Sequence, residues 1–277
     1  MIKFIFYFVL VLQIESIFLS SNCDCKAGII NKAEFENRVI DGVETPPNKY
    51  PWLVGLVLGN ENSTTECGGS LLSSRTVLTA AHCPNTGWVI TGQHIKSIIS
   101  GNERWYKVKS KTNHPLFNNR TIAYDLAIIT LEQDVEFNEY ARPICLPTDC
   151  TREYANDQVW VAGWGVESWP GNQSNVLREA KLTTMSNTEC CTSPNKYRCC
   201  EITDDMICAA DKSRRPCYGD SGGPIMINEN GLYTVIGVVS WGWTCYEDGF
   251  PGVFSRVTSN LYWIMSNIEG KQCSCQL

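Results

Sequence analysis

The sequence GDSGGP at residues 219–224 is a glycine-rich turn around a serine, and it decides how the rest of the chain is interpreted. Two earlier segments supply what a serine hydroxyl needs in order to react: LTAAHC at 78–83 carries a histidine, and YDLAII at 124–129 carries an aspartate. A hydroxyl becomes a nucleophile when an imidazole takes its proton and a carboxylate orients that imidazole. Taken singly, the three segments could be a packed histidine, a turn cap and a loop, so the inference depends on their joint presence.

Together these segments resemble the S1 family of chymotrypsin- and trypsin-like serine proteases, in which they occur in the same order. Further stretches match that family from about Arg38 to Ile268: RVIDG at 38–42, YPW at 50–52, CGGSL at 67–71, GWG at 163–165, DMICA at 205–209 and SWG at 240–242. The resemblance implies an all-β fold of two six-stranded antiparallel β-barrels, with the active site between them and a C-terminal α-helix. Short apolar runs between Gly-, Pro- and Asn-rich breaks also favour an all-β sandwich or barrels.

The resemblance implies roles for four residues. Ser221 is the expected nucleophile, His82 the general base, and Asp125 the carboxylate that fixes the tautomer of the imidazole. The backbone N–H groups of Gly219 and Ser221 are expected to form the oxyanion hole. The expected activity is hydrolysis of peptide bonds through an acyl-enzyme, with proteins or peptides as substrates and protein inhibitors as further partners. The alternative is a non-cleaving homologue that binds or regulates other proteins.

The segment around Arg38 predicts a zymogen. By resemblance, a separate trypsin-like protease cleaves after Arg38 and frees the α-amino group of Val39, which pairs with Asp220 and orders the loop around the nucleophile. This chain has Val-Ile-Asp-Gly where the family more often has Ile-Val-Gly-Gly, and Val39 keeps the β-branched apolar character. The alternative is that Arg38 is an exposed basic residue without this role.

The primary specificity pocket departs from the trypsin-like pattern. By resemblance, Arg215 lies at the base of the pocket, where trypsin-like members carry an aspartate. An arginine repels basic P1 side chains and binds carboxylates, so cleavage after Asp or Glu is one prediction. A large apolar P1 is the other, because Pro216 could turn Arg215 outward or the carboxylates at 247–248 could neutralise it. The remaining expected substrate-binding residues are Tyr218 at the rim, Ser240, Trp241 and Gly242 on the strand that binds substrate, and Gly252 in the wall.

The first residues have the pattern of a secretory signal. Nine consecutive apolar residues, FIFYFVLVL, begin at Phe4 and are followed by small polar residues, which predicts a signal peptide over residues 1–21 rather than a buried N-terminal strand or helix. Residues 22–38 are then the activation peptide, and residues 39–277 the protease domain. A secreted, extracellular glycoprotein is compatible with three sequons, at Asn62, Asn119 and Asn172.

All 15 cysteines follow the signal segment, so they enter an oxidising compartment, where a metal site is less expected than disulfides. By resemblance, three disulfides are expected: Cys67–Cys83, Cys190–Cys208 and Cys217–Cys245. Cys145 is expected to tether the activation peptide through Cys23 or Cys25. The sequence assigns no partner to the other member of that pair or to Cys150, Cys191, Cys199, Cys200, Cys273 and Cys275. The odd total leaves one thiol free or intermolecular.

Composition excludes several classes of protein. Of 277 residues, 43% are apolar and 19% are charged, which is not the composition of a disordered chain. The formal net charge of −6 argues against nucleic acid as a partner. After the signal segment, no apolar run is long enough to cross a membrane. The family's optional calcium loop would need several carboxylates at 94–104, and Glu103 stands alone there, so neither a metal nor another cofactor is expected.

Two further patterns predict local structure. Lys107, Lys109 and Lys111 alternate along an expected strand, which predicts one basic, solvated face or, alternatively, a secondary substrate-binding patch. Near the C-terminus, apolar residues recur with helical spacing at Leu261, Ile264, Met265 and Ile268. Thr258 or Ser259 is the expected cap of this helix, and Gly270 its expected end.

Overall fold

The computed structural model describes residues 42–59, 63–167, 170–192, 197–211, 216–243 and 250–272. The predicted signal peptide and activation peptide, with the bond after Arg38, lie outside these residues. Arg215, Asn62, Cys245 and the C-terminal cysteines also lie outside them. In the described part of the chain, no helix has both the length and the apolar character needed to cross a membrane.

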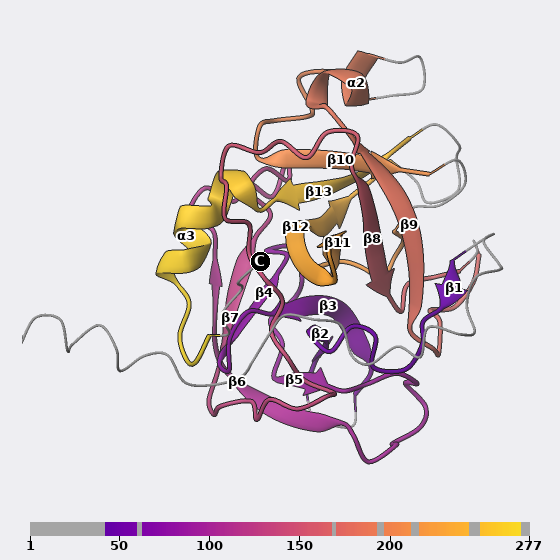
Figure 1. Ribbon diagram of the computed structural model, residues 1–277, viewed down its shortest axis with the longest axis vertical. Helices are drawn as coiled ribbons and strands as arrows, with labels where there is room; N and C mark the ends of the chain where they lie inside the picture. The colour runs from indigo at the N-terminus through magenta and orange to yellow at the C-terminus, as the bar shows by residue number, and fades with distance from the viewer. Residues whose placement is uncertain are drawn as a thin grey trace, which may run out of the picture.

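The first half of the chain forms a closed antiparallel barrel, drawn in indigo to magenta in the lower part of Figure 1. Its strands are β2 (Leu53–Val57), β3 (Thr65–Leu71), β4 (Thr76–Thr79), β5 (Trp88–Thr91), β6 (Arg104–Asn113) and β7 (Ala127–Leu131). Their order around the barrel is β2-β3-β4-β7-β6-β5, and β5 pairs with β2 to close it. Strands β2, β4 and β7 are buried along their whole length, as short continuous apolar runs predict.

The second half forms the other barrel, in the upper part of Figure 1. Its strands are β8 (Gln158–Gly163), β9 (Arg178–Met185), β10 (Met206–Ala210), β11 (Pro224–Glu229), β12 (Leu232–Trp241) and β13 (Gly252–Arg256). The order is β9-β10-β13-β12-β11-β8, and β8 pairs with β9 to close the barrel. A short strand, β1 (Val43–Glu44), adds to β9. The prediction of two six-stranded barrels is therefore confirmed.

Aromatic side chains dock the two barrels against each other. Trp52, immediately before β2, is fully buried, and its ring centroid lies 5.9 Å from that of Tyr50 and 5.2 Å from that of Tyr233 on β12. The indole N–H of Trp52 donates to Sδ of Met226 on β11 at 3.0 Å. Because the contacts of Trp52 with Tyr233 and Met226 cross from one barrel to the other, the barrels are held together by packed side chains.

The predicted C-terminal helix is confirmed, but both of its ends differ from the prediction: it ends at Ser266, with Asn267 as its C-cap, before Gly270. A 3₁₀ turn, η1 (Thr258–Asn260), leads into α3 (Leu261–Ser266), and the N-cap of α3 is Asn260 rather than Thr258 or Ser259. Asn260 makes no side-chain capping bond to α3. The preceding 3₁₀ turn supplies backbone structure where a capping side chain was expected.

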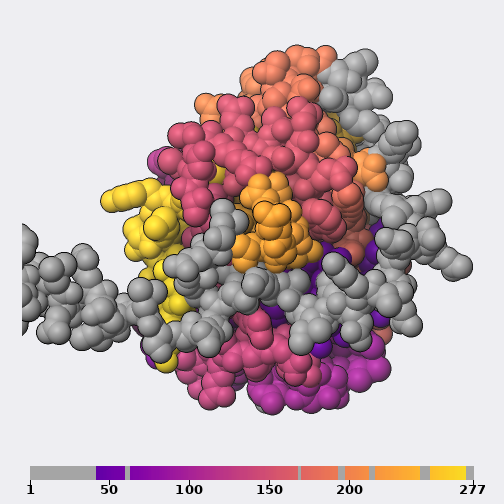
Figure 2. Space-filling model, viewed as in Figure 1, coloured from indigo at the N-terminus to yellow at the C-terminus, as the bar shows by residue number. Residues whose placement is uncertain are grey.

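The helix buries a narrower stripe than the sequence pattern predicts. Leu261 and Ile264 are buried and Ile268 packs against the core, whereas Met265 is 60% exposed. The yellow C-terminal segment lies at one side of the molecule, against the first barrel (Figures 1 and 2), and the hydroxyl of Thr76 there donates to the carbonyl of Glu269 at 2.9 Å. A short helix on the outside of a barrel contacts its neighbours along one line, so Met265 shares the apolar spacing without being buried.

The register of β6 overturns the prediction of a single basic face. Lys107 and Lys109 are exposed, and each pairs with a glutamate, at 3.2 and 3.5 Å. In the middle of β6 the pairing with β7 shifts by one residue, which reverses the alternation of inward and outward side chains. Lys111 consequently stands opposite the fully buried Ile129 and is only partly exposed.

A helix that the sequence analysis does not predict lies between β9 and β10. This helix, α2 (Asn187–Thr192), follows Ser186, whose hydroxyl accepts the N–H of Glu189 at 3.2 Å. The Glu189 carboxylate accepts the N–H and the hydroxyl of Ser186 at 2.9 and 2.8 Å. This reciprocal pair is a capping box, and the spacing Ser-x-x-Glu was the signal that could have predicted the helix.

Candidate active site

Two neighbouring strands bring His82 and Asp125 to one edge of the first barrel. Strands β4 and β7 are antiparallel, with Thr79 opposite Ala127. His82 follows the end of β4 and Asp125 precedes the start of β7, so the pairing of the strands places both residues at the same edge. Nδ1 of His82 and Oδ2 of Asp125 are 2.6 Å apart.

Asp125 is completely buried, and donors surround its carboxylate. Oδ1 accepts the backbone N–H of His82 at 2.8 Å, and Oδ2 accepts the hydroxyl of Ser240 at 2.6 Å as well as the imidazole. A buried carboxylate requires such donors. The contact at Nδ1 assigns the imidazole proton to that nitrogen and leaves Nε2 able to accept another proton.

Ser221 lies on the turn before β11, packed against the first barrel. Its carbonyl oxygen accepts the N–H of Gly68 at 2.8 Å. Gly222 has φ +79°, and a Cβ there would stand 2.5 Å from the carbonyl oxygen of Gly68 and 3.2 Å from Sγ of Cys83. Glycine fits this close approach, so the serine turn packs beside the residue that follows His82. The Ser221 hydroxyl makes no hydrogen bond within the described part of the chain, and contacts of this kind often tighten only when substrate binds.

The serine turn presents unpaired backbone donors. Among the described residues, the N–H groups of Gly219 and Ser221 have no acceptor, whereas those of Asp220 and Gly222 each donate to a carbonyl oxygen at 2.9 Å. Gly219 has φ +98°, which favours glycine. Two free donors on alternate residues of a turn can receive the oxygen of a substrate carbonyl as negative charge develops on it.

The carboxylate of Asp220 is enclosed by backbone. It accepts the N–H of Gly165 at 2.8 Å and that of Cys217 at 2.9 Å. A Cβ on Gly163 or Gly165 would stand 2.2 or 2.3 Å from a carboxylate oxygen, so the carboxylate occupies the space that these glycines leave. Burial raises the pKa of Asp220, while the two N–H groups and the charge of Lys96 act in the opposite direction. Asp220 makes no ion pair with any described residue.

The sequence analysis missed two residues near the serine turn: Gln173, which lies against Gly219, and Lys96, which is hydrogen-bonded to Gln173. A Cβ on Gly219 would stand 2.5 Å from Nε2 of Gln173. Oε1 of Gln173 accepts a hydrogen bond from Nζ of Lys96 at 2.5 Å, and the N–H of Lys96 donates to the carbonyl of Asn175 at 2.8 Å. No motif marks either side chain, because their proximity depends on two loops that meet only in the folded protein.

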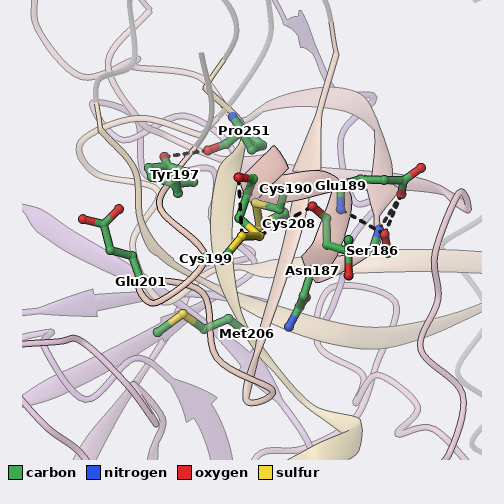
Figure 3. Close-up of a disulfide and its surroundings, with 12 residues drawn as sticks. Ser186, Asn187, Glu189, Cys190, Tyr197, Cys199, Glu201, Met206, Cys208 and Pro251 are labelled. Atoms are coloured by element: carbon green, nitrogen blue, oxygen red, sulfur yellow. Dashed lines mark hydrogen bonds between the residues drawn. A yellow bond between two sulfur atoms is a disulfide. The ribbon is translucent and has the colours of Figure 1, made fainter. Parts of the chain in front are cut away.

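The predicted strand for substrate lies at the end of β12. Ser240 and Trp241 are its last residues, and Gly242 follows them. Tyr197, which the sequence analysis missed, supports this edge: its ring stands T-shaped to that of Trp241 with centroids 4.9 Å apart. The Tyr197 hydroxyl donates to the carbonyl of Pro251 at 2.9 Å (Figure 3).

Three residues predicted to line the specificity pocket, Pro216, Tyr218 and Gly252, are among the described residues. A Cβ on Gly252 would stand 3.1 Å from Cδ of Pro216, so these two residues are in close contact. Tyr218, the residue predicted at the rim, is 64% exposed, and its place at the rim stays a prediction. Arg215 lies outside the described residues, and its place at the base of the pocket stays a prediction.

The described residues contain three disulfides: Cys67–Cys83, Cys190–Cys208 and Cys191–Cys199. The first two are pairs that the family resemblance implies, and the third, beside α2 (Figure 3), joins residues to which the sequence assigned no partner. Cys145 and Cys217 are also disulfide-bonded, and the predicted partner of Cys217, Cys245, lies outside the described residues. Cys150 and Cys200 are free and exposed.

The described surface includes two of the three sequons. Asn119 and Asn172 are both exposed, as a glycosylated asparagine must be, while Asn62 lies outside the described residues. Over the same part of the chain, no group of three or more His, Cys, Asp or Glu side chains is arranged to hold a metal ion.

Comparisons with known proteins agree on one family. The family model named Trypsin matches residues 39–264. Coagulation factor XI of Bos taurus is 30% identical over 254 residues, which cover 89% of this chain and 40% of factor XI. Venom serine protease Bi-VSP of Bombus ignitus is 35% identical over 239 residues, 81% of this chain and 66% of that protein. Trypsin 5G1 of Aedes aegypti is 36% identical over 238 residues, 84% of this chain and 86% of that protein. The chain thus spans less than half of factor XI but most of the mosquito protein.

Proposed function

Because the chain belongs to the trypsin family of serine proteases, we propose that it is a secreted serine endopeptidase, made as a zymogen and activated by cleavage after Arg38. One arrangement carries this proposal: the imidazole of His82 is bound to the buried carboxylate of Asp125, beside the Ser221 turn and its free N–H groups. A protein that only binds a partner has no need of this arrangement.

The proposed reaction proceeds through an acyl-enzyme. Nε2 of His82 takes the proton of the Ser221 hydroxyl as the oxygen attacks the substrate carbonyl, and Asp125 stabilises the imidazolium that forms. The N–H groups of Gly219 and Ser221 donate to the carbonyl oxygen as it becomes negative. His82 then returns the proton to the leaving amine, which completes acylation. Water repeats the sequence with the acyl group, releases the acid and restores Ser221.

The proposed switch is the partner of Asp220. Its carboxylate is bound by two backbone N–H groups and makes no ion pair with a described residue, and burial raises its pKa. A cation that reaches this site stabilises the ionised carboxylate. The α-amino group of Val39, freed by cleavage after Arg38 by a trypsin-like protease, is the cation that we assign. Asp220 lies between the two oxyanion donors, so this ion pair would hold both in place.

The proposed P1 preference is acidic or large and apolar rather than basic. Arg215 at the base of the pocket would repel Lys and Arg and could bind a carboxylate with two parallel hydrogen bonds. If Arg215 points outward, the pocket keeps an apolar wall at Gly252 and Pro216. In both cases Tyr218 adds an exposed aromatic ring at the rim.

Activation followed by a P1 series tests the proposal. The purified zymogen is cut after Arg38, the Val39 terminus is verified by sequencing, and peptides that differ only at P1 are offered. We expect cleavage after Asp and Glu or after Phe, Tyr and Leu; preferred cleavage after Lys or Arg would contradict the assigned pocket. Arg215→Ser should abolish an acidic preference and leave an apolar one unchanged. Ser221→Ala, taken through the same activation, measures any activity left by the activating protease.

A phosphonate probe separates the endopeptidase from a non-cleaving homologue. The probe labels a serine only where a base activates it, so Ser221 of the processed protein should react and Ser221→Ala should not. Labelling without peptide cleavage would indicate an active enzyme of narrow specificity. A correctly processed protein that is not labelled would contradict the endopeptidase and support the binding or regulatory alternative.

A further inference from the structure

The three lysines of β6 do not have the same surroundings. Lys107 and Lys109 are more than half exposed and pair with surface glutamates. Lys111 comes after the register shift of β6 and lies on the opposite face, against β7, whose start is close to Asp125. A lysine that is turned away from water needs polar partners for its ammonium group.

Lys111 finds those partners in the backbone on both sides of His82. Its Nζ donates to the carbonyl oxygen of Ala81 at 2.9 Å and to that of Cys83. Ala81 and Cys83 are themselves buried, at 5% and 2% exposure, so their carbonyl oxygens have little access to water. An ammonium group has three donors and can serve two converging acceptors at once.

These bonds restrain the two peptide groups that carry His82. The other described restraints on this turn are the two bonds from His82 to Asp125, one through its N–H and one through Nδ1, and the Cys67–Cys83 disulfide. None of them restrains the carbonyl of Ala81, and a disulfide acts on the Cys83 side chain rather than on its peptide plane. The lysine therefore supplies a restraint that no other described contact duplicates.

We propose that Lys111 is a positioning residue for the general base: it clamps the carbonyl groups before and after His82 and so holds the imidazole between Asp125 and Ser221. The proposal depends on the proposed endopeptidase function for its kinetic consequences. It assigns a role to Lys111, whereas Lys107 and Lys109 of the same strand form ion pairs at the surface. The described hydrogen bonds of the Lys111 ammonium go to the carbonyls of Ala81 and Cys83 and not to Ser221, so its proposed action is through His82.

Kinetics of matched variants test the clamp. Lys111→Met keeps an unbranched side chain of similar length but removes every donor, and Lys109→Met makes the same change on the exposed face. In the activated enzyme, we expect Lys111→Met to lower kcat about 10- to 100-fold with KM within about twofold, because a small misplacement of a catalytic group is costly. Lys111→Arg should recover part of kcat, and Lys109→Met should stay within about twofold of the parent. Lys111→Gln, which keeps one donor amide, serves if the methionine variant does not fold.

Active-site titration separates positioning from a loss of folding. A displaced imidazole lowers kcat per titrated active site while KM stays within about twofold, and Lys111→Arg should restore part of that kcat. A variant that is merely less stable would lose titratable active sites and keep the parental kcat per site. A kcat per site within twofold of the parent, or a fall in kcat that matches the loss of titratable active sites, would overturn the proposal.

A spectroscopic readout independent of catalysis decides the case if the parent enzyme is inactive. The chain has three histidines, so the ring resonances of His82 can be assigned in NMR spectra by substitution. Lys111→Met should shift the ring resonances of His82 relative to the parent, because the imidazole moves relative to Asp125, and Lys109→Met should not. Failure of peptide cleavage by the parent would count against the proposed function alone, whereas unchanged His82 resonances in all three proteins would count against the clamp.

Discussion

Substituting asparagine for Asp125 tests the proposed site more sharply than deleting a side chain, because it exchanges one oxygen for an amide nitrogen of nearly the same size. Oδ2 of Asp125 accepts from Nδ1 of His82 at 2.6 Å and from the Ser240 hydroxyl at 2.6 Å, and Oδ1 accepts the N–H of His82 at 2.8 Å. An asparagine has one acceptor oxygen, and its NH₂ group only donates. In the asparagine variant, the NH₂ group therefore takes the place of one of the two carboxylate oxygens and points at groups that are themselves hydrogen-bond donors.

Both orientations of the amide impair His82. If the amide oxygen takes the place of Oδ1, the NH₂ group faces Nδ1, and the imidazole must carry its proton on Nε2, where it cannot accept the proton of Ser221. If the amide is reversed, the NH₂ group opposes the His82 N–H, and the turn has to move. An asparagine at this place in a Ser-His-Asp triad lowers kcat by about 10⁴-fold through the wrong tautomer. We expect about 10³- to 10⁴-fold here, which corresponds to about 4 to 5.5 kcal/mol of activation free energy.

The assay measures kcat and KM of the activated variant on the best peptide of the P1 series. The matched control is Asp134→Asn, which makes the same exchange at a carboxylate that is 49% exposed and is bound by Arg75 and Ser74. The control should keep kcat within about twofold, since surface ion pairs contribute little. Urea unfolding of both variants shows whether the native state is retained. If folded Asp125→Asn enzyme kept more than about a tenth of the parental kcat, the roles assigned to His82 and Asp125 would be refuted.

Two further predictions concern Asp220 and His114. In Gly165→Ala the new Cβ would stand 2.3 Å from a carboxylate oxygen of Asp220, so the carboxylate must shift. We expect kcat after activation to fall by at least about tenfold, and the free energy of unfolding in urea to fall by about 1 to 3 kcal/mol. Unchanged values for both would contradict the reasoning. His114 is buried and its ring contacts those of Tyr124 and Trp263. Burial lowers the pKa of His114 below the ordinary 6.5, so near that pH the imidazole is protonated more in the unfolded chain than in the native state. Stability should therefore fall as pH decreases through about 6.5, and His114→Phe should flatten this dependence in denaturation curves at several pH values, whereas parallel curves for parent and variant would exclude the effect.

The family motifs predicted the architecture because several of their glycines stand at positions where the fold leaves no room for a side chain. Gly222 must be glycine because a Cβ would meet the carbonyl of Gly68, and Gly163 and Gly165 because Asp220 fills their space. Such requirements follow from close approaches between distant segments, so a chain that meets all of them in order has few folds available. The same reasoning predicted that His82, Asp125 and Ser221 come from both barrels, and the structure places them along one interface.

Features that depend on the register of strand pairing or on contacts between loops could not be predicted in this way. A shift of one residue in β6 moves Lys111 to the opposite face, and period-two spacing carries no information about such a shift. Gln173 reaches Gly219 only because two loops associate. The capped helix α2 is different: its Ser186 and Glu189 spacing is visible in the sequence. The helix was missed because its residues, NTECCT, carry no apolar period and Cys190 is its buried residue.

Asp125 shows why the site is a property of both barrels and of neither alone. It belongs to the first barrel, yet the second barrel supplies the Ser240 hydroxyl to its carboxylate at 2.6 Å and the Ser255 hydroxyl to its carbonyl at 2.9 Å. In return, Gly68 of the first barrel binds the carbonyl of Ser221, on the second, at 2.8 Å. Each barrel thus fixes a reactive group that the other carries. Hydrogen bonds of this length do not survive a displacement of about 1 Å, so the geometry on which the proposed chemistry depends is set by how the barrels dock.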